Sequence, residues 1–358
     1  MFENDFYQNL IESLRNNCSF LKEVHLSRKN MVDDELKSLS EVLKTNSTLK
    51  DIYLSLNKIG KKGMKHFSNT LKINSTLSYL SLSDNNLGDS GIKHLSEALK
   101  TNSTLTEIYL SGNKIQDEGI RCLAEALKEN DSIKLINLSH NDFKAEGMKY
   151  LADALIANTS ITHLDLSGNY LGDQEIIYLS ESLKKNNNLQ ELILSLNNIG
   201  EEGIMHFAEA LKFNSSITKI NLNYNQFRTG IEFLSEAFKI NTSLVEIELV
   251  NNHFDNESLE ILVESLKINS SLRNIDLSNN ISSENLFDHI KVNLLSQIKL
   301  LLSCNTEWFP SMHSFTFEKF RSSVLCFLLC LNTKQHQLRL PKLILFEIIK
   351  RIDRKYFI

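Results

Sequence analysis

A 28-residue repeat runs through most of the chain and constrains its fold more than any other feature. The copy that starts at Leu105 reads LTEIYLSGNKIQDEGIRCLAEALKENDS. Ten copies follow one another at steps of 28 residues, with a single step of 27, and they begin at Leu21, Leu49, Leu77, Leu105, Ile133, Ile161, Leu189, Ile217, Leu244 and Leu272. A fixed period of this length is typical of a solenoid, in which each repeat contacts its neighbours. The sequence therefore predicts one elongated repeat domain.

Each repeat combines a strand-like half with a helix-like half. In the copy at Leu105, Ile108 and Leu110 alternate with polar residues, which is the period of a half-buried strand. The second half has the spacing of one amphipathic helical stripe, at Ile120, Leu123, Ala124 and Leu127. The pattern predicts alternating strands and helices.

An asparagine stands between the two halves of nearly every repeat, at Asn57, Asn85, Asn113, Asn141, Asn169, Asn197, Asn225, Asn252 and Asn280. Stacked at one level, these side chains can satisfy backbone groups that the packed turns would otherwise leave unpaired. We interpret this asparagine ladder as structural, and losing one member should cost about 1–3 kcal/mol.

The pattern L-x-x-[IL]-x-L-S-x-N-x-[IL]-G followed by a helix resembles the leucine-rich repeat, in its 28-residue ribonuclease-inhibitor-like class. That class also covers the repeats of Ran GTPase-activating proteins and nucleotide-binding innate immune receptors. The resemblance extends from Leu21 to about Asn305. It implies an α/β fold: a right-handed, horseshoe-shaped solenoid with a parallel sheet on the concave face and helices on the convex face. It implies no particular chemistry, because function in such folds depends on the site.

The domain organisation follows from where the repeat begins and ends. Residues 1–20 are predicted to form an N-terminal helical cap with an apolar stripe at Leu10, Ile11 and Leu14. Residues 21–305 form the solenoid of ten repeats, plus a degenerate eleventh strand at 300–302. Residues 306–358 are predicted to form a C-terminal helical cap or a small helical module.

The C-terminal residues allow a second interpretation. The run from Ser323 to Cys330 and the run LRLPKLILFEII from Leu338 are similar to a suppressor-of-cytokine-signalling box or an F-box, which would make the protein a ubiquitin-ligase substrate adaptor. The adaptor-binding Leu-x-x-x-Cys of those modules is absent, and we favour the cap.

The sequence contains no phosphate-binding loop, HExxH, GxSxG or calcium-loop motif, so we expect no enzyme activity, catalytic residue, metal or cofactor. The segment from Asp84 to Gly88 resembles a turn of the Ran GTPase activators. However, their irregular early repeat with a projecting arginine has no counterpart in the even early repeats here. GTPase activation remains an alternative to a scaffold.

Composition favours an intracellular protein. The amino terminus has no signal-peptide pattern, no apolar run reaches 18 residues, and the five cysteines are odd in number without CxxC spacing. We expect a cytoplasmic monomer, or delivery to a host cytoplasm if the source is an intracellular microbe. The sequons at Asn46, Asn74 and Asn102 should then stay unmodified.

The third and fifth residues of each strand are expected to point away from the helices, onto the inner face. Eight of these twenty residues are acidic and one is basic: Glu23, His25, Asp51, Tyr53, Tyr79, Ser81, Glu107, Tyr109, Leu135, Asn137, His163, Asp165, Glu191, Ile193, Lys219, Asn221, Glu246, Glu248, Asn274 and Asp276. Their balance of −7 compares with −10 for residues 1–305, since residues 306–358 carry nine basic and four acidic side chains. This acidic stripe predicts a protein partner with a basic surface and disfavours nucleic acid. Chance use of polar residues on a wet sheet face is the alternative.

The partner-binding residues we predict are Asp51, Tyr53, Tyr79, Ser81, Glu107, Tyr109, Asp165, Glu191, Glu246 and Glu248. In an in-register sheet, Tyr53, Ser81 and Tyr109 form one row, with Tyr79 in the row beside it. The hypothesis is that two tyrosines flank a serine-floored gap that anchors a basic side chain by cation–π attraction of about 0.5–2 kcal/mol. Alternatively, the exposed tyrosines pair with one another across the sheet.

Overall fold

The computed structural model describes residues 4–280, leaving aside the side chains of residues 4, 5 and 256. The chain divides into two units, Met1–Asn305 and Thr306–Ile358, and every described residue belongs to the first. The expected eleventh strand, the C-terminal helices and the segment similar to a ubiquitin-ligase module lie outside the described residues. The proposed domain boundaries therefore stay a prediction.

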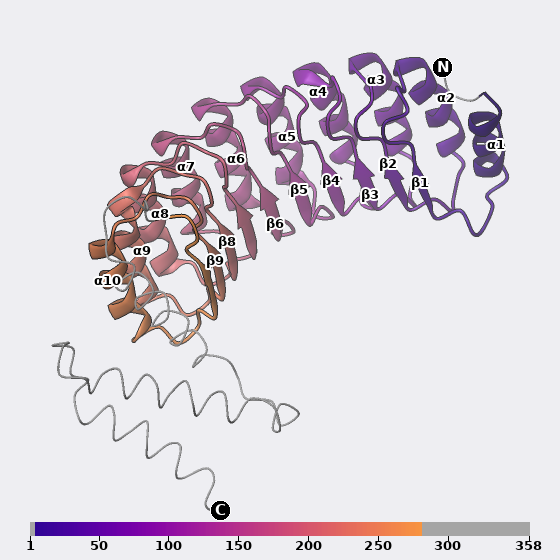
Figure 1. Cartoon of the computed structure of the whole chain (residues 1–358). Coiled ribbons are helices and arrows are strands. Elements are labelled where there is room, and N and C mark those ends of the chain that lie inside the picture. Colours follow the sequence, from indigo (N-terminus) through magenta and orange to yellow (C-terminus); the bar gives the residue numbers. More distant parts are fainter. Residues whose placement is uncertain (1–3, 281–358) are drawn as a thin grey trace, which may run out of the picture. The chain divides into compact units, whose positions relative to one another are not determined.

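Ten strands of three residues form one parallel sheet, in which each strand pairs with the strands of the neighbouring repeats (Figure 1). The strands are β1 Glu23–His25, β2 Asp51–Tyr53, β3 Tyr79–Ser81, β4 Glu107–Tyr109, β5 Leu135–Asn137, β6 His163–Asp165, β7 Glu191–Ile193, β8 Lys219–Asn221, β9 Glu246–Glu248 and β10 Asn274–Asp276. Equivalent residues pair throughout, so the sequence period sets the register.

A helix precedes β1 and one follows each strand from β1 to β9. The helices are α1 Asn4–Arg15, α2 Asp33–Leu43, α3 Lys61–Leu71, α4 Gly88–Leu99, α5 Asp117–Glu129, α6 Ala145–Ala157, α7 Asp173–Leu183, α8 Glu201–Phe213, α9 Ile231–Phe238 and α10 Asn256–Leu266. In Figure 1 the strands line the inner side of the curved array and the helices its outer side. The predicted α/β solenoid is confirmed.

The single 27-residue step corresponds to a local change in the helix layer. α9 has 8 residues, against 11 to 13 in α2–α8, and a 3-10 turn over Arg228–Gly230 precedes it. Gly230 lies tightly against α8, because a β-carbon there would be 2.3 Å from Ile204 Cγ2. The shorter repeat is thus absorbed in the helix and leaves the sheet register intact.

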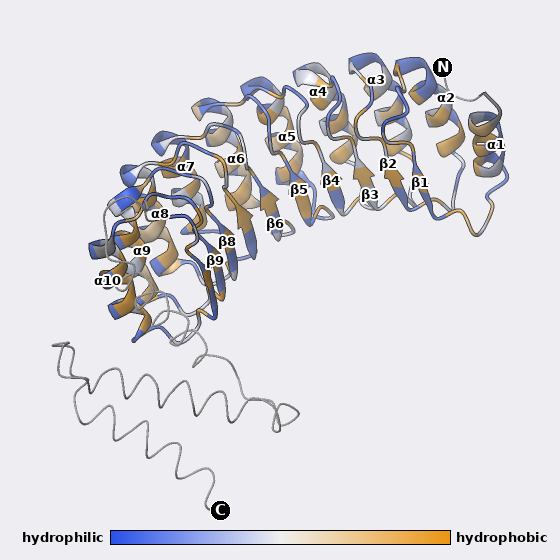
Figure 2. Cartoon of the chain, in the orientation of Figure 1, coloured by the Kyte–Doolittle hydropathy of each residue, from blue (hydrophilic) through white to orange (hydrophobic). Residues whose placement is uncertain are grey.

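The core lies between the two layers and runs the length of the repeats (Figure 2). The middle residue of each strand from β1 to β9 is buried, and so is the expected stripe of α5. α1 covers the N-terminal end of this core with Leu10, Ile11 and Leu14. Its Tyr7 hydroxyl donates to the Glu35 carbonyl at 2.6 Å. Each repeat therefore buries its apolar face only against its neighbours.

The asparagine ladder is buried, as predicted, with its members 0–7% exposed. Asn141 shows the shared pattern: its Nδ2 donates to the carbonyls of Leu110 and Leu138 at 3.1 and 3.0 Å. Its Oδ1 accepts from the backbone N–H groups of Asn113 and Ile115 at 3.0 and 3.1 Å. One side chain thus satisfies backbone groups of two repeats.

A second asparagine ladder, which the sequence analysis missed, runs along the ends of the helices. Its members are Asn46, Asn74, Asn102, Asn130, Asn158, Asn186, Asn214, Asn241 and Asn269, all 3–7% exposed. Asn130 donates to the carbonyls of Leu99 and Asn102 and accepts from the N–H groups of Ser132 and Ile133. The sequon residues Asn46, Asn74 and Asn102 belong to this ladder, so the fold has no room for a glycan on them.

Candidate interaction surface

All ten predicted binding residues lie on the inner face of the sheet. In every strand the middle residue is the most buried, while its two neighbours are half-buried or exposed, with Ser81 the one buried exception. The pairs Tyr53–Ser81 and Ser81–Tyr109 are in register, as are Asp51–Tyr79 and Tyr79–Glu107. The expected rows therefore exist.

Four aromatic rings from β1 to β4 form a continuous stack, the aromatic ladder of His25, Tyr53, Tyr79 and Tyr109. Ring centroids of His25 and Tyr53 are 4.3 Å apart at an interplanar angle of 14°. Tyr79 lies 4.7 Å from Tyr53 and 5.1 Å from Tyr109, tilted by 38° to each. His25, on the same row as Tyr53, is a member that sequence reasoning did not identify as an aromatic partner.

The serine-floored gap expected between Tyr53 and Tyr109 is not open. The Tyr79 ring leans across from the neighbouring row and occupies it, above the buried Ser81. The alternative, in which the tyrosines contact one another, describes these rings correctly. Register alone could not show this, because a tyrosine reaches a diagonal neighbour as easily as a direct one.

The hydroxyl groups of the ladder sit among carboxylates. Burial raises the pKa of Tyr109, and the negative charge of Glu107 adds to the effect; the Tyr109 hydroxyl donates to Glu107 Oε2 at 3.2 Å. Burial also raises the pKa values of Tyr53, where Asp51 contributes, and of Tyr79, where a hydrogen bond with Ser81 acts in the opposite direction. The three tyrosines of the ladder are thus uncharged at neutral pH and have acidic borders.

The acidic candidates on β7 to β9 are held differently, in a carboxylate network. Lys219 Nζ lies 3.6 Å from Glu191 and 3.8 Å from Glu246, and His163 Nε2 lies 3.7 Å from Glu191. Glu248 Oε2 accepts from the side-chain amides of Asn221 and Asn223 at 2.7 and 2.8 Å. These carboxylates already have partners on the same face.

Between the ladder and the network the inner face is hollowed. One hollow of about 130 Å³, here called the inner hollow, is lined by side chains of β4 to β7, among them Tyr109, Leu135, His163, Asp165, Glu191 and Ile193. A second, shallower hollow of about 310 Å³ lies over Glu191, Lys219 and Glu246. Leu135 and Ile193 were not among the predicted binding residues. The signal for them was present, since they are the two aliphatic residues among the twenty inner positions.

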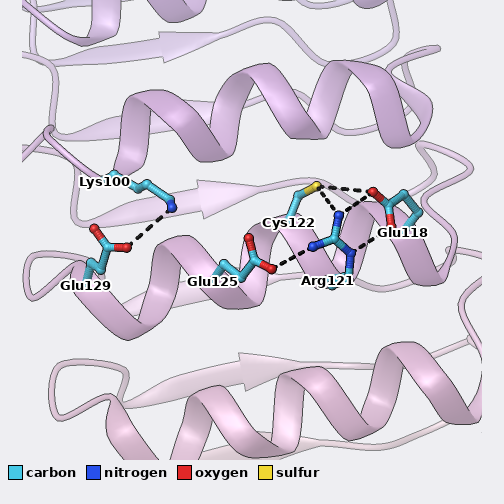
Figure 3. A network of polar contacts seen from close by, with 6 residues as sticks. All are labelled: Lys100, Glu118, Arg121, Cys122, Glu125 and Glu129. Atoms are coloured by element: carbon cyan, nitrogen blue, oxygen red, sulfur yellow. Dashed lines mark hydrogen bonds and ion pairs between the residues drawn. The ribbon is translucent and has the colours of Figure 1, made fainter.

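The outer helices carry ion pairs, some within one helix and some between neighbouring repeats. Five Glu–Lys pairs at spacing i, i+3 form, on α2, α7, α8, α9 and α10. On α5, however, Glu125 binds Arg121 at 2.6 Å, and Lys100 of the preceding repeat reaches Glu129 at 3.3 Å (Figure 3). Glu97 likewise lies 4.0 Å from Lys72 of the neighbouring repeat instead of pairing with Lys100. Arg121 binds the Glu125 carboxylate and, with the same planar guanidinium, also binds Glu118.

Neither a metal site nor a membrane-spanning helix is present in residues 4–280. No group of three or more His, Cys, Asp or Glu side chains there could hold a metal ion. Within the same range, no helix has both the length and the apolar character needed to cross a bilayer.

Comparison with known proteins identifies the repeats. The leucine-rich-repeat family matches residues 45–68, 74–96, 101–124, 129–152, 157–175 and 185–208. No curated protein matches the chain. Among solved structures, the chain is similar to "Leiomodin-1 Actin-Binding Site 2 (ABS2)", with 24% identity over 42% of this chain and 87% of that one, at a TM-score of 0.38. That likeness carries no argument about a partner. The six matched repeats, together with the in-register sheet, show that residues 45–208 are built of leucine-rich repeats, which are typical of protein-interaction scaffolds.

Proposed function

We propose that the chain is a non-catalytic scaffold that binds one protein partner on its inner face, with the aromatic ladder as the main contact. The aromatic ladder is the observation that carries this proposal: four stacked rings on the solvent side of a sheet whose other side already packs the core. Tyrosines are enriched among the residues that dominate protein interfaces. Stacking also holds the rings in place before binding, which reduces the entropy lost on association.

The chemistry of the partner follows from the charges around the ladder. The inner positions of β1 to β4 carry Glu23, Asp51 and Glu107 and neither lysine nor arginine. A basic surface on the partner would match these charges and speed association. Ten strands at about 4.8 Å spacing extend over about 43 Å, which is long enough for a standard interface of about 800 Å² per partner.

Affinity capture from the native cell, followed by measurement of the dissociation constant of the purified complex, tests the proposal. Tyr53→Ala should weaken binding at least tenfold, a loss of about 1.4 kcal/mol. Tyr170→Ala is the matched control, because Tyr170 is an exposed tyrosine outside the inner strands. Normal binding by Tyr53→Ala, with binding abolished by Glu246→Lys and Glu248→Lys, would move the contact to the other end of the sheet and refute the role of the ladder.

A further inference from the structure

The aromatic ladder ends at His25 and at Tyr109, and the Tyr109 end opens into a hollow. Tyr53 lies between His25 and Tyr79, and Tyr79 lies between Tyr53 and Tyr109, so both have rings on two sides. Among the described residues Tyr109 has one ring neighbour, because β5 presents Leu135 and Asn137 beside it. Its other side forms a wall of the inner hollow, as Tyr109 lines that space.

Part of the lining of the inner hollow is aliphatic. Leu135 of β5 and Ile193 of β7 are half-buried on the inner face, and the buried Ile136 and Leu164 lie beneath. With a volume of about 130 Å³, the hollow has room for the end of one long side chain. An aromatic wall and an aliphatic surface suit a side chain with an apolar stem.

The hollow also holds one carboxylate that no cation balances. Asp165 accepts hydrogen bonds from Asn137 Nδ2 at 2.7 Å, from the Ser167 N–H at 2.9 Å and from Ser167 Oγ at 2.7 Å. All three donors are neutral, and in the described part of the chain no lysine, arginine or histidine lies within ion-pair distance of it. Glu191, at the same hollow, is instead shared between His163 and Lys219.

We propose that the inner hollow accepts one lysine or arginine side chain of the partner, an inference that rests on the proposed function. The stem lies over Leu135 and Ile193, and the cation lies above Asn137, which stands between the free face of Tyr109 and Asp165 in the same row. A cation over a tyrosine face gains electrostatic attraction, and it supplies the counter-charge that Asp165 lacks. An apolar side chain would instead cover that carboxylate without compensating its charge, which is unfavourable. The anchor for a basic side chain thus lies beyond Tyr109, outside the space that Tyr79 fills.

A small cation tests this pocket without the partner. Methyl NMR of the full chain should show saturable shifts of the Ile193 δ1 and Leu135 methyl groups on titration with n-butylammonium chloride. The uncharged isostere 1-butanol should bind at least fivefold more weakly. Asp165→Asn and, separately, Tyr109→Leu should each weaken n-butylammonium binding at least fivefold.

The matched control is Asp276→Asn on β10. Asp276 occupies the equivalent strand position and accepts from the N–H and Oγ of Ser278, just as Asp165 does from Ser167. This substitution should leave the titration unchanged. Equal binding of 1-butanol and n-butylammonium, or an unchanged titration in Asp165→Asn, would overturn the inference.

The partner complex separates this inference from the proposed function. If Tyr53→Ala loses the partner while Asp165→Asn keeps its affinity within twofold, the ladder binds the partner and the basic-side-chain pocket is refuted. If Tyr53→Ala binds normally, the proposed function fails whatever the small cation does.

Discussion

The inner face of β1 to β4 and that of β6 to β9 are built on the same repeat, but their polar side chains interact in different ways. In the first region, rings stack on rings and the acidic side chains Asp51 and Glu107 border them. In the second, Lys219 joins Glu191 to Glu246, and asparagine amides bind Glu248. A count of acidic and basic residues along the sequence does not distinguish the two regions. The difference teaches that the first region, together with Asp165 at the edge of the second, presents side chains whose interactions a partner could extend without breaking others.

The largest expected effect is on stability, and it tests whether the same asparagine ladder supports both regions. Asn85→Ala beneath the first region and Asn197→Ala beneath the second should each lower the free energy of unfolding by about 1–3 kcal/mol, since each leaves buried backbone groups unpaired. Urea denaturation measures this loss. The exposed neighbours Asn86→Ala and Asn198→Ala serve as controls. A marked difference in the loss of unfolding free energy between Asn85→Ala and Asn197→Ala would show that the asparagine ladder supports the two regions unequally.

The surface layers of the two regions should differ in their contribution to stability. Tyr79→Ala removes two ring pairs, each worth about 0.5–1.5 kcal/mol, and should destabilise by about 1–2 kcal/mol. Lys219→Met removes two ion pairs whose side chains are 27–38% exposed, and such pairs contribute about 0–1 kcal/mol. Melting temperatures of the two variants show which substitution destabilises the chain more. A larger loss for Lys219→Met would reverse our ranking of ladder over network.

Alkaline pH should act on the first region. The pKa values of Tyr53, Tyr79 and Tyr109 are raised in the folded chain, so the unfolded chain ionises first, near pH 10. The stability that these neutral hydroxyls contribute is complete below about pH 10 and is lost as the pH rises above it. Denaturant midpoints between pH 8 and 11.5 should fall, and less steeply in Tyr109→Phe.

Some slope should remain in Tyr109→Phe. Tyr7 on α1 lies outside both regions, and burial raises its pKa to about 12. Tyr7→Phe therefore separates the contribution of the cap from that of the ladder. An identical slope in Tyr109→Phe and the unmodified chain would count against the link between pH and the ladder.

The smallest effect concerns the rim above each region. Leu56 and Leu196 are exposed and hold φ values of 60° and 55°, a left-handed conformation unfavourable for leucine. Replacing either with asparagine, which stands at the equivalent position 251, should raise stability by up to about 1 kcal/mol. Gly168→Asn provides the contrast at an equivalent position: a β-carbon there would lie 2.4 Å from His140 Nδ1, so stability should fall. Destabilisation by the Leu196 substitution would indicate that its side chain packs usefully.

Much of the fold could be predicted because the same pattern of strand and helix positions recurs in ten copies of the repeat. Residues such as Ile108 and Asn141 have roles fixed by position, so strand, register and buried asparagine follow from spacing. The ladder at Asn46 and Asn130 was equally periodic, yet polar sequon residues resemble an exposed loop until their hydrogen bonds are seen. The candidate site was less predictable: its residues share one face, but their contacts with each other do not follow from spacing.

The sequence by itself determined which side chains lie on the inner face, since a period of two and a repeat of 28 residues, with one step of 27, leave one solution for the sheet. Only the tertiary structure decided what those side chains do there. Tyr79 fills the space beside Ser81, Lys219 neutralises Glu191, and Asp165 is left with neutral donors at the edge of a hollow. The physical reason is that backbone pairing repeats with the sequence. Long side chains, in contrast, choose among several neighbours within reach, and the choice depends on all of them at once.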